Sequence, residues 1–319
     1  MRSIDVSDLV ERTRAGDRRA VARLISFVEN DAPQLREITA ALVPLSGRAH
    51  VIGLTGSPGV GKSTSTSALV TGFRARGQRV GVIAVDPSSP FSGGALLGDR
   101  VRMQEHSGDD GVFIRSMASR GHLGGLAAAT AATLRVLDAA GCDIVLIETV
   151  GVGQAEVDIA SLADTTLVLL APGMGDGIQA AKAGILEIAD IFVVNKADRD
   201  GAEQTTRDLR HMQAHNPRAR TAGWRPPIVK TIASRKEGLD RLIEAIDSHQ
   251  VWMTESGELP RRRCDRAAAE IEAIALSQVS RRFAHLHGDV ALATAAENVV
   301  AGATDPYSAA DRLVAALSG

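Results

Sequence analysis

The residues best suited to chemistry in this 319-residue chain stand together at positions 56–63, which read G-S-P-G-V-G-K-S. Two glycines, a lysine and a serine at this spacing match the pattern G-x-x-x-x-G-K-[ST], whose backbone N–H groups cradle phosphate oxygens. We expect Lys62 to reach the β- and γ-phosphates of a nucleoside triphosphate and the Ser63 hydroxyl to bind Mg²⁺. The expected nucleotide contacts in this segment are Gly56, Ser57, Pro58, Gly59, Val60, Gly61, Lys62, Ser63 and Thr64.

The segments on either side of this loop predict a strand and a helix that hold it in place. Residues 50–54 form an apolar run that suits a buried strand, and residues 63–76 can form a helix with an apolar face. A helix that starts at the loop turns its positive amino end toward the phosphates. This order of strand, loop and helix favours nucleotide binding over a glycine-rich turn that arose by chance.

A second motif, Asn195-Lys196-Ala197-Asp198, closes the apolar run 191–194 and indicates which base is bound. The Asp198 carboxylate can accept two hydrogen bonds, from guanine N1–H and N2–H₂, whereas adenine has no matching pair of donors. A site built on paired bonds rejects the wrong base, because its polar group would stay unpaired. Ala233 and Ser234 follow the next strand and suit a backbone contact to guanine O6. We therefore expect GTP and GDP as ligands, contacted by Asn195, Lys196, Asp198, Ala233 and Ser234.

Acids near the ends of other apolar runs are candidates for the magnesium site. Asp86 ends one run, and Asp99 follows in Gly98-Asp99-Arg100; Mg²⁺ takes one or two carboxylates together with water and phosphate oxygens. Glu148 ends another run, where we expect it to hold a water on Mg²⁺ or to orient the attacking water. Gly151 can offer its N–H to the γ-phosphate. The expected catalytic residues are Lys62, Asp86 and Glu148, and the expected metal site comprises Ser63, Asp86, Asp99 and, through a bound water, Glu148.

Composition excludes several other classes of protein. The net charge is −2 and aromatic residues make up 3%, so we expect neither nucleic-acid binding nor attraction to an anionic membrane. The sequence has no long apolar stretch and no visible secretory signal at its start. Two cysteines are too few for a disulfide framework, which fits a reducing compartment. We expect a cytoplasmic protein.

The order of apolar and helical segments predicts an α/β fold in three parts. Residues 1–47 form an N-terminal helical extension, residues 48–250 a P-loop domain with a mostly parallel β-sheet flanked by helices, and residues 251–319 a C-terminal helical region. The C-terminal helices are too few to bury their own apolar faces, so they pack on the sheet domain or, as we favour, against a second subunit. We interpret the basic run 261–263 as a solvated helix start. The predicted strands are 50–54, 79–86, 111–117, 143–149, 165–171, 190–195 and 227–232.

Beyond single motifs, five segments together closely resemble the MeaB/MMAA group of GTPases, which serve as chaperones of adenosylcobalamin-dependent acyl-CoA mutases, chiefly methylmalonyl-CoA mutase. The resemblance runs from about residue 5 to the C-terminus and is most specific between residues 50 and 200. The segments are Ser57 to Ser63, Val85 to Gly94, Gly98 to Met103, Arg120 to Gly125, and Glu148 to Gln154.

The resemblance implies an activity and a set of moving segments. It places Asp86 and Asp99 in switch I as acids linked to Mg²⁺, and it makes Glu148 the start of switch II. It implies an additional switch from Pro172 onward that reorganises at the partner interface. It also implies a homodimer formed through the C-terminal helices, and GTP hydrolysis coupled to cofactor loading or protection of a mutase. The expected switch residues are Gln154, Asp176, Gln179 and Lys182.

Two other functions compete with this one. A metallochaperone GTPase of the nickel-insertion kind would carry a His-rich tract or a Cys-x-x-Cys-type motif, but the eight histidines are scattered. A kinase or transport-associated ATPase would need a site for adenine, and Asp198 argues against it. Metal analysis tests the first alternative, and comparison of GTP with ATP affinity tests the second.

Overall fold

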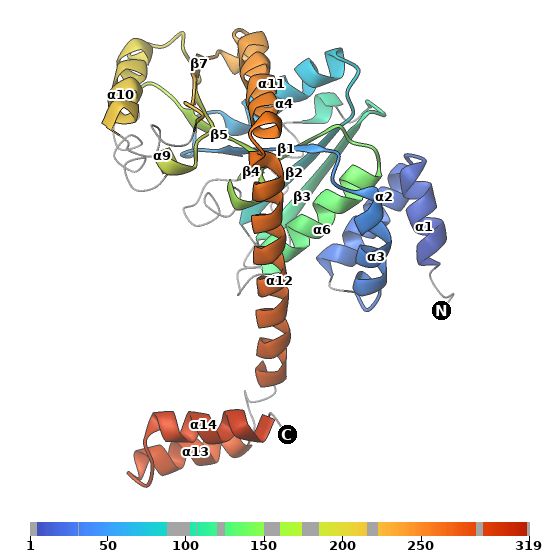
Figure 1. Ribbon diagram of the computed structural model, residues 1–319, viewed down its shortest axis with the longest axis vertical. Coiled ribbons are helices and arrows are strands. Elements are labelled where there is room, and N and C mark those ends of the chain that lie inside the picture. The colour runs from blue at the N-terminus through green and yellow to red at the C-terminus, as the bar shows by residue number, and fades with distance from the viewer. Residues whose placement is uncertain are drawn as a thin grey trace.

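The computed structural model describes residues 5–30, 32–87, 103–106, 108–119, 125–149, 160–173, 185–215, 223–284 and 290–317. Its centre is a seven-stranded sheet with the order β3-β2-β4-β1-β5-β6-β7, in which every pairing is parallel (Figure 1). This arrangement confirms the predicted fold class, and each strand ends within two residues of its predicted position. The strands are β1 (His50–Thr55), β2 (Val80–Pro87), β3 (Val112–Ser119), β4 (Ile144–Thr149), β5 (Thr165–Leu170), β6 (Ile191–Val194) and β7 (Ile228–Lys230).

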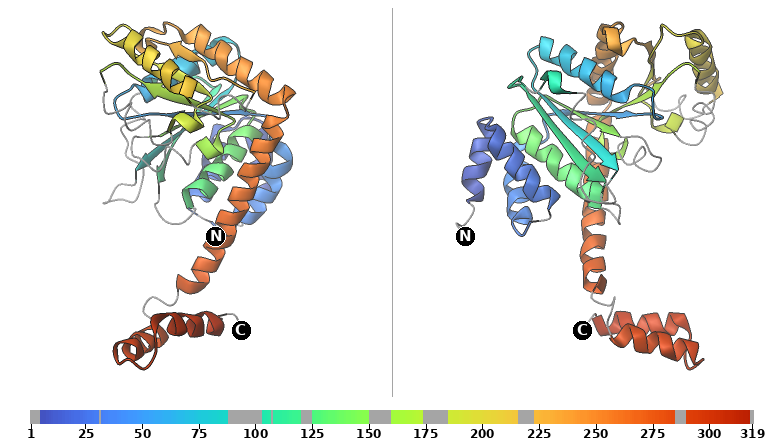
Figure 2. Two further views of the ribbon diagram at one scale, coloured as in Figure 1. Left: turned by 60° about the vertical axis from the view of Figure 1, so that its left-hand side comes forward. Right: turned by 180° about the vertical axis from the view of Figure 1, so that it is seen from behind.

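Helices cover both faces of the sheet, because successive side chains of a buried strand point to opposite sides. In β4, Ile144 and Leu146 pack in the core shared with α4 and α11, whereas Val145 and Ile147 pack in the core shared with α6 and the N-terminal helices. The helices α1, α2 and α3 lie beside α6 (Figure 2). The helices that surround the sheet are α1 (Val6–Arg14), α2 (Arg18–Glu29), α3 (Leu35–Leu42), α4 (Lys62–Ala75), α6 (Gly125–Ala139), α9 (Ile185–Ile188), α10 (Ala202–His215) and α11 (Leu239–Glu255), with short 3₁₀ turns η1 (Val43–Leu45), η2 (Gln104–His106) and η4 (Ala233–Arg235).

The C-terminal helices extend away from the sheet. Helix α12 (Glu258–Ala284) runs along α6, where Arg135 pairs with Glu270, and then projects beyond the globular part. At its far end α13 (Val290–Val300) and α14 (Pro306–Leu317) form a hairpin (Figure 1). The Asp305 carboxylate accepts hydrogen bonds from the N–H groups of residues 307 and 308 and so caps the last helix.

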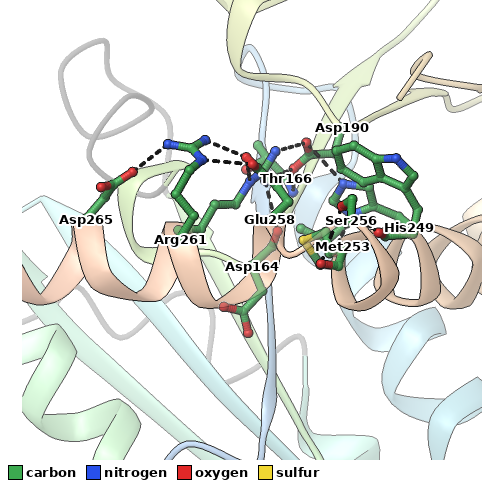
Figure 3. A network of polar contacts seen from close by, with 12 residues as sticks. Asp164, Thr166, Asp190, His249, Met253, Ser256, Glu258, Arg261 and Asp265 are labelled. Atoms are coloured by element: carbon green, nitrogen blue, oxygen red, sulfur yellow. Dashed lines mark hydrogen bonds and ion pairs between the residues drawn. The ribbon is translucent and has the colours of Figure 1, made fainter. Parts of the chain in front are cut away.

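An ionic network joins α12 to the amino ends of the strands (Figure 3). Asp164 and Asp190 stand just before β5 and β6 and are buried. Arg262 donates two hydrogen bonds of 2.8 Å to the Asp190 carboxylate, and Arg263 donates one of 3.0 Å to Asp164. The prediction of a solvated helix start is therefore wrong for these two arginines, whose side chains are about three-quarters buried, and right for Arg261, which is 60% exposed.

Two buried histidines extend this network into the core. The Thr165 hydroxyl lies 2.7 Å from His50 Nε2 and 2.8 Å from His249 Nδ1, and His249 Nε2 lies 3.3 Å from the Asp190 carboxylate. Burial lowers the pKa of His50 to about 4. Burial alone would raise the pKa of Asp190, but hydrogen bonds from His249 and Arg262 outweigh it, so that this pKa is lowered. We call Asp164, Asp190, His50, His249, Thr165, Arg262 and Arg263 the amino-edge network.

Candidate functional site

The predicted phosphate loop connects β1 to α4 at the carboxyl edge of the sheet. Because β1 lies between β4 and β5, the loop stands where the strand order changes direction, the usual ligand position in such sheets. Gly56 has φ 141° and Gly61 has φ 97°, a region that disfavours other residues. A Cβ atom at Gly56 would also collide with the Leu169 carbonyl oxygen, and one at Gly61 with the Asn195 amide. Both glycines are therefore required by the path of the loop.

Lys62 and Ser63 occupy the first turn of α4. The Lys62 ammonium donates to the carbonyl oxygen of Gly56, and to that of Ser57 at 3.3 Å, so the lysine folds back over its own loop. Both Lys62 and Ser63 are largely buried, whereas Thr64 is exposed. The ammonium thus lies inside the loop, where the oxygens of a phosphate would take the place of the carbonyls.

Asn195 holds three segments of the site together. Its side-chain amide donates to the Val60 carbonyl at 2.9 Å, and its oxygen accepts from the Ala233 N–H at 3.1 Å and from the Thr231 hydroxyl at 3.2 Å. Asn195 is only 2% exposed. One amide therefore ties the phosphate loop to the loop that follows β7, and sets the spacing between the two.

Lys196 and Asp198 lie at the rim of the same region. The Lys196 ammonium donates to the Gly59 carbonyl at 2.6 Å, and its backbone adopts φ 56°. The Asp198 carboxylate is 37% exposed and stands 3.7 Å from the guanidinium of Arg235. Ser234, which precedes Arg235 in η4, is exposed. The carboxylate predicted to bind guanine is thus accessible to a ligand.

Glu148 lies at the carboxyl end of β4 and is completely buried. Its position in the strand has the same parity as Ile144 and Leu146, so its side chain turns toward α4. There the Thr66 hydroxyl donates to the Glu148 carboxylate. Thr66 is absent from the sequence-based predictions, although its position four residues after Lys62 places it on the same side of the helix.

The oxygen donors of this edge fit a magnesium ion. A buried carboxylate is stable when it is paired or binds a cation, and the Ser63 hydroxyl and the Glu148 carboxylate are ligands of the type that Mg²⁺ prefers. Asp86 is the residue before the last in β2, which pairs directly with β4, although its side chain lies outside the described part of the structure. The predicted residues Asp99, Gly151, Gln154, Asp176, Gln179 and Lys182 also lie outside the described residues.

The part of the chain that the structure describes holds neither a cluster of metal ligands nor a membrane-spanning helix. Within these ranges, His, Cys, Asp and Glu side chains form no group of three or more that could hold a metal ion. Among the helices described, none is both long enough and apolar enough to span a bilayer.

Comparison with known proteins places this site in a family. The family described as methylmalonyl Co-A mutase-associated GTPase MeaB matches residues 21–287. A Pyrococcus abyssi protein named as a GTPase is 48% identical over 315 residues, which cover 98% of this chain and 97% of that protein. The Mus musculus protein named methylmalonic aciduria type A homolog, mitochondrial, is 34% identical over 94% of this chain and 77% of its own length.

A solved structure has the same fold. The crystal structure of a LAO/AO transport system kinase is 26% identical to this chain, covers 99% of it with 100% of its own length, and has a TM-score of 0.74. The family match over residues 21–287 establishes that the chain belongs to the MeaB family of methylmalonyl-CoA mutase-associated GTPases.

Proposed function

We propose that this protein is a Mg²⁺-dependent GTPase that acts as a chaperone of an adenosylcobalamin-dependent acyl-CoA mutase, with methylmalonyl-CoA mutase as the partner. The observation that carries the proposal is the bracing of the phosphate loop by Asn195, which stands in the motif predicted to read guanine. The family match and the mouse relative support the choice of partner.

Hydrolysis depends on a few positioned groups. Lys62 would bind the β- and γ-phosphates, and the Ser63 hydroxyl, with Asp86 and Asp99, would hold Mg²⁺. When bound, Mg²⁺ neutralises charge that develops on the phosphate oxygens. Glu148 would accept a hydrogen bond from a water and orient it. These groups act through position and electrostatics, since phosphoryl transfer needs little covalent chemistry from the protein.

Selection of guanine would rest on the other half of the site. The Asp198 carboxylate accepts from N1–H and N2–H₂ of the base, and the backbone after β7, at Ala233 and Ser234, meets O6. Asn195 keeps this half at a constant distance from the phosphate loop. Because the carboxylate suits guanine and not adenine, it argues against an ATP-dependent kinase activity.

Coupling to the partner would use the segments that meet the γ-phosphate. Gly151 would bind it through its N–H, and Gln154, Asp176, Gln179 and Lys182 would change position when it is lost. We also propose that residues 251–319 form the dimer contact, because large apolar side chains stay exposed along α12, among them Ile271 and Leu276, which are 69% and 56% exposed. We also propose that the three parts of the chain, the N-terminal helices, the P-loop domain and the C-terminal helices, meet at residues 47 and 250.

The test is a comparison of GTP and ATP hydrolysis by the purified protein, with and without purified methylmalonyl-CoA mutase. We expect slow hydrolysis of GTP alone, acceleration by the mutase, and little hydrolysis of ATP. Equal rates for the two nucleotides would overturn the guanine assignment. A rate for GTP that the mutase leaves unchanged would overturn the chaperone assignment while leaving the GTPase intact.

A further inference from the structure

The contact between Thr66 and Glu148 joins two parts of the chain that the motifs treat separately. Thr66 lies in the second turn of α4 and Glu148 at the end of β4, and both side chains are completely buried. The hydroxyl donates to the carboxylate across this interface. A hydrogen bond between two buried side chains is strengthened because water is excluded from it.

The Thr66 hydroxyl has a second acceptor within reach. It lies 3.1 Å from the carbonyl oxygen of Lys62, four residues earlier in the same helix. A hydroxyl carries a single hydrogen, so at any moment it donates either to the Glu148 carboxylate or to the Lys62 carbonyl. When the carboxylate moves away, the hydrogen can turn back to the helix and no buried donor is left unpaired. Release of Glu148 therefore costs less than it would from a donor with one partner.

We propose that Thr66 is a positioning residue for Glu148. Its hydroxyl holds the carboxylate beside the first turn of α4, where Ser63 would bind Mg²⁺, and can release it without being left unpaired. The inference rests on the proposed function for its catalytic meaning, but the contact itself exists without nucleotide. Thr66 does not touch the reacting atoms and acts through the placement of Glu148.

The first experiment is a Mg²⁺ titration of the Thr66→Val protein, because valine keeps the shape of threonine and removes the hydroxyl. We expect the Mg²⁺ concentration for half-maximal GTP hydrolysis to rise about tenfold, as is typical when a partner of a metal-linked group is removed. At saturating Mg²⁺ the KM for GTP should stay unchanged while kcat falls. Thr66→Ser, which keeps the hydroxyl, should restore both quantities.

A matched control separates this role from simple packing. Thr206 on α10 is equally buried, at 2% exposure, and its hydroxyl makes the same bond to its own helix, 2.9 Å from the Ala202 carbonyl. Thr206→Val should therefore lower the melting temperature and leave the Mg²⁺ dependence as it is. If Thr206→Val and Thr66→Val have the same Mg²⁺ dependence, the proposal fails. Thr66→Ala replaces Thr66→Val should the latter not fold.

A second measurement does not depend on hydrolysis. Melting temperatures of Thr66→Val, Glu148→Gln and the double variant, taken without Mg²⁺, form a double-mutant cycle. Non-additive shifts are expected, and additive shifts overturn the proposal whatever the protein hydrolyses. The Mg²⁺ concentration at which the GDP-bound protein gains half of its added thermal stability should also rise in Thr66→Val. A wild-type protein without GTPase activity would refute the proposed function, while these two readouts would still decide the role of Thr66.

Discussion

The two edges of the sheet use their charged side chains in opposite ways. At the amino edge, Arg262 and Arg263 meet the carboxylates of Asp190 and Asp164, so that each charge has a permanent partner of opposite sign. At the carboxyl edge, the ammonium group of Lys62 donates to backbone carbonyls. Hydrogen bonds from a cation to phosphate are stronger than those to a carbonyl, so a nucleotide can replace these contacts at a net gain.

This difference indicates which edge carries stability and which carries function. Ion pairs between side chains of the protein itself fix α12 against the strands. By contrast, the Lys62 ammonium donates to backbone carbonyls of the phosphate loop, and a bound phosphate can replace these carbonyls as the acceptor. Substitution of the loop lysine at the carboxyl edge should therefore change binding with little change in stability. Substitutions at the amino edge should do the reverse.

The largest effect is expected for Asp198→Asn. An asparagine presents one donor and one acceptor, which match xanthine, whose second carbonyl replaces the guanine amino group. We expect the preference for GTP over XTP to change by about 10⁴-fold, because a site built on paired hydrogen bonds discriminates to this degree. Competition binding of the two nucleotides measures it. Asp200→Asn, at an exposed position nearby, is the control, and an equal loss in both variants would contradict the assignment.

The second largest effect is expected for Lys62→Ala. We expect GTP affinity to fall about 10³-fold, or ~4 kcal/mol, because a buried charge that pairs with phosphate is removed. The free energy of unfolding without nucleotide should change much less, since the lysine then donates to carbonyls of its own loop, and these are weaker partners than phosphate. Calorimetric titration and denaturant unfolding measure the two quantities. The exposed Lys236→Ala serves as control, and an affinity loss of the same size there would refute the role of Lys62.

At the amino edge, Arg262→Ala should reverse this pattern. Loss of the guanidinium leaves the Asp190 carboxylate buried beside His249, which should cost about 3 kcal/mol in the free energy of unfolding. The Kd for GTP should stay close to that of the wild type. The neighbouring Arg261→Ala removes an arginine that is 60% exposed, and should cost at most about 0.5 kcal/mol. Similar losses in the two variants would show that burial does not distinguish these arginines.

A smaller effect is expected from pH. His50 is neutral in the folded protein because burial lowers its pKa from 6.5 to about 4. The unfolded chain then binds a proton that the folded chain does not, so stability is complete above pH 6.5 and is lost as the pH falls toward 4. Between about pH 7.5 and 5 the free energy of unfolding should fall by about 2 kcal/mol.

Denaturant unfolding at several pH values measures this slope, with His50→Gln as the control. Asp164, His249, Arg263 and Asp247 influence the same site but are present in both proteins. The variant should be less sensitive to pH over this window. Equal slopes for the two proteins would assign the pH dependence to other groups.

Local spacing made the strands and the phosphate loop predictable from the sequence. The loop residues are adjacent in the chain, and each buried strand is a short apolar run. Arg262 could not be interpreted in this way, because its partner Asp190 lies 72 positions earlier. Glu148 and Thr66 are 82 positions apart, and only the packing of β4 against α4 brings them together. A pattern within one segment cannot report a contact that the fold creates between two.

The aromatic side chains around His249 give the molecule a built-in optical signal. The chain has two tryptophans, and both contact this histidine: the ring centroids of Trp224 and Trp252 lie 4.8 Å and 5.5 Å from that of His249. Trp224 also donates its indole N–H to the Asp190 carbonyl. Tryptophan emission therefore originates wholly at the amino edge, on the opposite side of the sheet from the phosphate loop. A change in emission when GTP binds would mean that binding at the carboxyl edge alters the structure around His249, near the start of α12. The measurement needs no attached dye.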